Sequence, residues 1–146
     1  MDEYILKRHN KTLLLYHLVF PVKYRRKVID ILISESIKEI CLEIADRFEI
    51  EFVEIGTDED HIHFLVQSVP TMSVDQMIRT IKSITAREIF HKFPEVKKEL
   101  WGGNFWTSGY NANTVGHYGN AEVINKYVEN QGRQYKQLYI QQLKLW

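Results

Sequence analysis

Residues 51–69, EFVEIGTDEDHIHFLVQSV, are the most informative part of the chain for its fold. Residues 51–56 and 61–69 are rich in β-branched, aromatic and other apolar residues, and an acidic stretch at residues 57–60, Thr-Asp-Glu-Asp, separates them. Two such runs joined by a short polar turn are typical of two paired antiparallel strands. The sequence therefore predicts a β-hairpin near the middle of the chain.

The sequence on either side of this hairpin predicts one helix before it and one after it. Residues 26–48 carry apolar residues at the spacing of one helix face. After the hairpin, Ser73 is a suitable N-cap for a second helix that runs to about Phe93, where Pro94 stops it. Two helices thus flank the central hairpin in the sequence.

Two more strands and a last helix complete the predicted order βαββαβα. We expect strands at residues 12–22 and 105–115 and an amphipathic helix at residues 121–142. This order fits an α+β, ferredoxin-like sandwich, in which one antiparallel sheet carries two helices on a single face. The C-terminal helix would then cover the other face, in its own subunit or in a partner. No repeat or linker divides the chain, so residues 1–146 are predicted to form a single domain.

A formal net charge of zero conceals a strong segregation of charge along the 146 residues. Residues 28–60 carry a net charge of −9, and the remainder carries +9. The acidic side chains can form a solvated helix face while the basic remainder meets an anionic partner, so neutrality does not exclude nucleic acid. The sequence has one cysteine and no apolar run of the roughly 20 residues that span a membrane. We expect a cytoplasmic protein with no membrane contact.

The most distinctive chemical motif is His61-Ile62-His63, in the third predicted strand. Strand alternation places both imidazoles on one sheet face and Ile62 on the other, toward the helices. Two imidazoles at this spacing can bind the same metal ion. A His-x-His pair also occurs in strands with no metal, so the motif alone leaves a structural role open.

The predicted last helix offers two groups that could complete such a site. Tyr127 and Gln131 are four residues apart and therefore lie on the same helix face. The Gln131 amide oxygen together with two imidazoles would make a three-ligand site, and mixed nitrogen and oxygen ligands suit Mg²⁺ or Mn²⁺. Tyr127 could act as a nucleophile if a base or a metal-bound water takes its proton. By itself, a tyrosine at this position is more often an ordinary residue of an amphipathic helix.

Four blocks of this sequence, in this order, resemble the single-tyrosine transposases of prokaryotic insertion sequences, the IS200-like group of the His-hydrophobic-His (HUH) endonucleases. The blocks are YHLVFPVKYRRK at 16–27, TDEDHIH at 57–63, GY with TVG at 109–116, and YVENQ at 127–131. The resemblance implies that His61, His63 and Gln131 bind a divalent metal, Mg²⁺ or alternatively Mn²⁺. It also implies that Tyr127 is the catalytic nucleophile.

The same resemblance implies a substrate and an assembly. Members of this family cleave and rejoin single-stranded DNA at hairpin-bearing element ends, through a 5′-phosphotyrosine and a free 3′-OH. They act as homodimers in which the tyrosine helix of one subunit can serve the histidines of the other. A domesticated nickase that processes hairpin repeats would share this chemistry. A non-catalytic nucleic-acid-binding module and a small metal-dependent hydrolase are alternatives from other classes.

Two groups of basic residues are candidates for DNA binding. The first is a run with an aromatic residue inside it, where arginines could pair with phosphates and the tyrosine could stack on bases. The second lies on the second predicted helix; either group could instead be plainly solvated. Together they comprise Lys23, Tyr24, Arg25, Arg26, Arg79, Lys82 and Arg87. We expect His17 to be a wall residue, and Trp101, Phe105 and Trp106 to lie in the core or a dimer interface.

Overall fold

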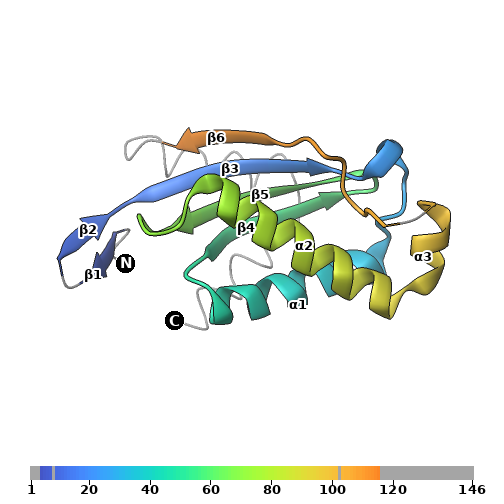
Figure 1. Cartoon of the computed structure of the whole chain (residues 1–146), viewed down its shortest axis with the longest axis horizontal. Helices are drawn as coiled ribbons and strands as arrows, with labels where there is room; N and C mark the ends of the chain where they lie inside the picture. The colour runs from blue at the N-terminus through green and yellow to red at the C-terminus, as the bar shows by residue number, and fades with distance from the viewer. Residues whose placement is uncertain (1–3, 8, 102, 116–146) are drawn as a thin grey trace.

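The computed structural model describes residues 4–7, 9–101 and 103–115, and its main sheet has four antiparallel strands in the order β4-β5-β3-β6. Figure 1 shows helices α1 and α2 together on one face of this sheet. This arrangement confirms the predicted ferredoxin-like α+β fold. The elements of the sandwich are β3 (Leu14–Pro21), α1 (Ile31–Arg47), β4 (Glu51–Asp58), β5 (His61–Ser68), α2 (Val74–Lys92) and β6 (Asn111–Val115).

Helix α2 begins and ends close to the predicted positions because its N-terminal signal is strong. The Ser73 hydroxyl accepts a hydrogen bond from the Gln76 amide, and the Gln76 side chain accepts one from the Ser73 amide. This reciprocal pair is a capping box, which satisfies two backbone donors that the first helical turn leaves free. Pro94 follows the helix as expected, and it also starts a short helix that we did not predict, α3 (Pro94–Glu99).

Helix α1 begins five residues later than predicted. The Asp30 carboxylate caps it by accepting a hydrogen bond of 2.8 Å from the Ile33 amide. The preceding Val28 and Ile29 are buried but lie outside any helix, so their apolar character supports core packing and not helix formation. Ile31 and Leu32 fall within the apolar pattern predicted for residues 26–48, but both side chains are exposed. The buried face consists of Ile33, Ile37, Ile40, Cys41 and Ile44.

The last predicted strand is shorter than expected. Phe105 and Trp106 are buried in the core, where Trp106 makes only an isolated bridge with Val22, and β6 begins at Asn111. A second small hairpin, which we did not predict, joins β1 (Ile5–Lys7) to β2 (Asn10–Thr12). Between β3 and α1 lies a 3₁₀ turn, η1 (Lys23–Arg25). The predicted helix at residues 121–142 lies outside the described residues.

The core fills the space between the sheet and the two helices. Ile62, Phe64 and Val66 of β5 all point into it, and the rings of Phe20 and Phe64 meet edge to face at 5.2 Å between centroids. The alternate residues of β5, which include both histidines, therefore lie on the opposite sheet face, as the alternation predicted. In the described part of the chain, no helix is long and apolar enough to cross a membrane.

Candidate metal centre and its surroundings

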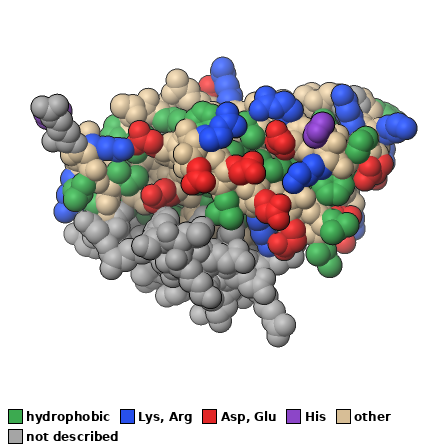
Figure 2. Space-filling view, turned by 90° about the horizontal axis from the view of Figure 1, so that it is seen from below, with side chains coloured by type: hydrophobic (Ala, Val, Ile, Leu, Met, Phe, Trp, Pro, Cys, Tyr) green, Lys and Arg blue, Asp and Glu red, His purple; other side chains and the backbone are tan. Residues whose placement is uncertain are grey.

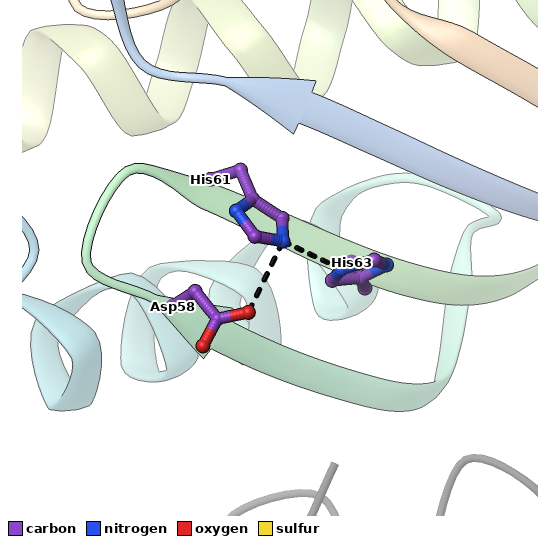
Figure 3. A group of neighbouring side chains, drawn as sticks. All are labelled: Asp58, His61 and His63. Atoms are coloured by element: carbon purple, nitrogen blue, oxygen red, sulfur yellow. Dashed lines mark hydrogen bonds and ion pairs between the residues drawn. The ribbon is translucent and has the colours of Figure 1, made fainter. Parts of the chain in front are cut away.

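Two histidines and a carboxylate converge at the end of the β4–β5 hairpin. His61 Nε2 lies 2.8 Å from His63 Nε2 and 3.1 Å from the nearer oxygen of Asp58 (Figure 3). Strand pairing creates this cluster, because Asp58 is the direct cross-strand partner of His61. One ligand atom from each residue lies within 4.8 Å of the others. This is the geometry of three side chains that can share one cation.

The protonation of the cluster favours a bound cation. Burial, and secondarily the neighbouring His61 and His17, lowers the pKa of His63 to about 4, so its imidazole is neutral at pH 7. A neutral imidazole has the lone pair that a metal requires. His61 Nε2 faces both the His63 nitrogen and the Asp58 carboxylate, so the cluster offers two nitrogens and one oxygen to a cation.

Asp60 orients His61 from the other side of its ring. An Asp60 oxygen lies 2.7 Å from His61 Nδ1, and this hydrogen bond is the main reason that the pKa of Asp60 is lowered. An ionised carboxylate accepts a hydrogen bond from Nδ1–H, and this tautomer has the lone pair on Nε2, where it can bind a metal. Carboxylates in this position fix the tautomer and orientation of metal-binding histidines. The residues present therefore fit a divalent metal site with a supporting carboxylate.

The basic segment that follows β3 is attached to the same hairpin turn. The backbone amides of Val22 and Ile29 donate to the carbonyls of Asp60 and Glu59 at 2.8 and 2.9 Å. Arg25 Nε donates to the second Asp60 oxygen at 3.2 Å. Asp60 thus binds His61 with one oxygen and Arg25 with the other, which joins the predicted DNA-binding run to the predicted metal site.

His17 forms part of the wall behind the cluster. Its ring stacks against that of His63, with 5.9 Å between centroids and an angle of 10° between the planes. Burial lowers the pKa of His17, which favours its neutral form. His17 does not belong to the three-residue cluster of possible ligands, in agreement with its predicted role as a wall residue.

The second group of basic candidates lies on the helix side of the sheet. Arg79, Lys82 and Arg87 of α2 line a groove of about 960 Å³ together with residues 103–108. The described lining of this groove includes His91 and Lys97 but no acidic side chain. Figure 2 shows that elsewhere on the helix side, acidic and basic side chains are interspersed.

The individual cations of this group have different surroundings. The Lys82 ammonium donates to the carbonyls of Thr107 and Gly109, both at 2.9 Å, and so holds the loop before β6. Arg79 pairs with Asp75 one turn earlier at 2.9 Å.

The structure therefore brings together only part of the predicted site. His61 and His63 are adjacent, whereas Tyr127 and Gln131 lie outside the described residues. Asp58 and Asp60 were not predicted as site residues. Their signal was the acidic turn immediately before the histidines: Asp58 is the cross-strand partner of His61, and Asp60 directly precedes His61 in the sequence.

Comparison with known proteins places these features in a family. The model of the family described as "Transposase IS200 like" matches residues 10–131. The chain is 34% identical over 116 residues to the ISDra2 transposase TnpA of Deinococcus radiodurans, covering 80% of this chain and 82% of that protein. It is 28% identical over 116 residues to a Salmonella typhimurium transposase for insertion sequence element IS200, covering 80% of this chain and 75% of that protein.

Solved structures agree with the sequence comparison. A crystal structure of a candidate transposase from D. radiodurans superposes with a TM-score of 0.70 at 29% identity, covering 88% of this chain and 98% of that one. A REP-associated tyrosine transposase bound to a REP hairpin has the same fold, with a TM-score of 0.56 at 10% identity, covering 90% of this chain and 76% of that one. From the family match over most of its length, we conclude that the chain belongs to the IS200-like transposases.

Proposed function

We propose that this transposase cleaves and rejoins single-stranded DNA through a covalent bond to Tyr127. The observation that carries the proposal is the convergence of His61 Nε2, His63 Nε2 and an Asp58 oxygen, with Asp60 fixing the His61 ring. A transposase needs a group that positions and polarises a phosphodiester. This cluster, next to an arginine-bearing turn, offers such a group on the described part of the chain.

The metal in this proposal is Mg²⁺, with Mn²⁺ as the alternative. His61 and His63 would supply two nitrogen ligands, and Gln131 would supply an amide oxygen from the last helix. Asp58 would supply an additional oxygen ligand, because one of its carboxylate oxygens lies 3.1 Å from His61 Nε2. Mixed nitrogen and oxygen ligation of this kind suits Mg²⁺ and Mn²⁺. A bound divalent ion supplies Lewis-acid polarisation of a phosphoryl oxygen and stabilises negative charge on the leaving oxygen.

The proposed covalent step conserves the energy of the phosphodiester. The Tyr127 hydroxyl loses its proton, and its oxygen attacks the phosphorus in line with the bond to the 3′ oxygen. That bond breaks, and the 3′ oxygen takes a proton to become a free 3′-OH, while the 5′ phosphate stays on Tyr127. The reverse attack by a 3′-OH releases Tyr127 and joins the strands. No external energy source is needed, because one phosphate ester replaces another.

The proposed DNA partner carries hairpins at the ends of an insertion sequence. A transposase of the same fold was solved bound to a REP hairpin, and we extend hairpin recognition to this chain. We also propose a homodimer in which the tyrosine helix of one subunit serves the histidines of the other. The histidines lie on the sheet face opposite α1 and α2, which is the face that we expect the C-terminal helix to cover in its own subunit or in a partner, and this location supports the proposal.

The test uses hairpin oligonucleotides taken from the DNA that flanks the gene. Wild-type protein with Mg²⁺ should give a protein–DNA adduct that survives denaturation, and Tyr127→Phe should give none. Tyr139→Phe, a matched change in the same C-terminal region, should retain the adduct. Chelation or His63→Ala should abolish it, because both remove the group that polarises the phosphate. Equal adduct yields from wild type and Tyr127→Phe would refute Tyr127 as the nucleophile.

A further inference from the structure

Two aromatic side chains lie on the surface, away from the hydrophobic core. Tyr24 of η1 is 60% exposed, and Trp101, which follows α3, is 75% exposed. Their rings contact each other edge to face, with 6.4 Å between centroids. By contrast, Phe105 and Trp106 in the same region are buried. Core packing therefore accounts for the aromatic residues Phe105 and Trp106, but not for Tyr24 and Trp101.

The backbone at these two residues is held in an unfavourable conformation. Tyr24, Arg25 and Trp101 have φ angles of 60°, 52° and 51°, and they are the non-glycine residues of the described chain with positive φ. Trp101 occupies the position after the Leu100 C-cap, where glycine is strongly favoured because it has no Cβ. Strained residues of this kind are concentrated at functional sites. Here the strain occurs in two separate segments that meet at the exposed ring pair.

Each ring has its own cation. The Lys23 ammonium lies 5.1 Å from the centre of the Tyr24 ring, and the Arg26 guanidinium lies 5.5 Å from the centre of the Trp101 ring. Neither cation has an ion-pair partner in the described ranges of the chain. Exposed aromatic rings combined with unpaired cations match the two parts of a nucleotide, because bases stack on rings and phosphates attract cations.

The segment that carries Tyr24 is connected to both the basic groove beside α2 and the metal cluster. The Lys23 amide donates to the Phe105 carbonyl at 2.9 Å, and Phe105 lines the basic groove beside α2. On the other side, Arg25 binds Asp60, which binds His61. Figure 1 shows η1 and the end of α3 at the same end of the molecule. The segment that carries Tyr24 is therefore hydrogen-bonded both to the lining of the groove and, through Arg25 and Asp60, to the metal cluster.

We propose that Tyr24 and Trp101 form a stacking site for one unpaired base of single-stranded DNA, with Lys23 and Arg26 holding the flanking phosphates. The inference rests on the proposed function for its substrate class, and it adds a residue, Trp101, that we had expected in the core or an interface. The site recognises the face of a base. It should therefore prefer single strands to duplexes, whose bases are already stacked.

The test measures binding by fluorescence anisotropy, with labelled dT12 and a 12-base-pair duplex as probes. All proteins carry Tyr127→Phe, so that cleavage does not affect the measurement. Trp101→Gly should weaken binding of dT12 roughly 5- to 100-fold, the range seen when one aromatic platform is removed. Its melting temperature should stay level or rise, because glycine suits this backbone. Trp101→Phe should retain most of the binding.

The control and the contrary outcomes separate this inference from the proposed function. Leu6→Ala removes an equally exposed apolar side chain from β1 and should leave binding of dT12 unchanged. If Trp101→Gly binds dT12 as tightly as its parent, or loses duplex binding to the same degree, the stacking site is refuted. If the parent protein itself does not bind dT12, single-stranded DNA as substrate fails, and with it the proposed function.

Discussion

Replacing Glu54 by glutamine should stabilise the protein at neutral pH. Glu54 belongs to β4 and is paired with Leu65, on the sheet face that carries the histidines. Its side chain is fully buried, and neither carboxylate oxygen has a hydrogen-bond partner among the described residues. Removal from water disfavours the charged form and raises its pKa from 4.5 to about 8. The folded protein therefore keeps this carboxyl group neutral at pH 7.

The size and sign of the effect follow from proton linkage. Above pH 4.5 the unfolded chain releases the Glu54 proton, whereas the folded protein keeps it until pH reaches about 8. In this window the folded state binds more protons, so the free energy of unfolding falls by up to about 1.4 kcal/mol per pH unit. The accumulated loss is about 3 kcal/mol at pH 7, as an upper estimate. Glutamine has a similar shape and no such loss.

Urea unfolding of both proteins, from pH 5 to pH 8.5 with chelator present, tests this reasoning. We expect the stability advantage of Glu54→Gln to grow with pH up to about 8 and then to level off. His63 has the opposite sign: its pKa is lowered to about 4, so its contribution is present above pH 6.5 and is lost as pH falls toward 4. That contribution is common to both proteins and cancels in the difference. Parallel stability curves for the two proteins would refute a buried, neutral Glu54.

Two further changes test the site and the fold. Asp60→Asn should weaken Mn²⁺ binding roughly 10- to 100-fold in calorimetric titrations, because it removes the charge that orients His61. Glu59→Gln is the control and should bind Mn²⁺ as tightly as the wild type, since the ion pair of Glu59 with Lys27 is long, at 3.9 Å, and exposed. Equal affinities for the two variants would contradict the orienting role. Ser73→Ala should lower the free energy of unfolding by about 1 kcal/mol in urea, since it removes one half of the capping box; an unchanged midpoint would show that the cap contributes nothing.

Elements with a local signal could be predicted, and elements set by distant packing could not. The hairpin and α2 were correct because alternation and the Ser73 cap act within a few residues. The predicted start of α1 was wrong because Val28 and Ile29 continue an apolar pattern but are buried in non-helical backbone. Likewise, Trp106 was expected in a strand, but β6 begins only at Asn111. The apolar character of Trp106 reflects the packing of its ring in the core.

The same distinction applies to the site. Strand alternation was sufficient to place His61 and His63 on one face. The role of Asp58 depends on the register between β4 and β5, and the link from Asp60 to the basic run depends on a contact with Arg25, 35 residues away. A single sequence contains the residues for these contacts but not the pairing that brings them together.

The structure also changes the meaning of the acidic segment. On α1 the acidic side chains are exposed, as expected for a solvated face, whereas each acidic side chain of the hairpin turn is paired with a basic or imidazole group. Asp60 neutralises Arg25 and orients His61 at the same time, so Arg25 is partly occupied before any DNA arrives. In the basic segment after β3, the cations that remain available to phosphate are Lys23 and Arg26, and both lie over exposed aromatic rings. The available cations and exposed rings of the basic segment therefore favour a ligand that combines phosphates with unpaired bases, which is what single-stranded DNA provides.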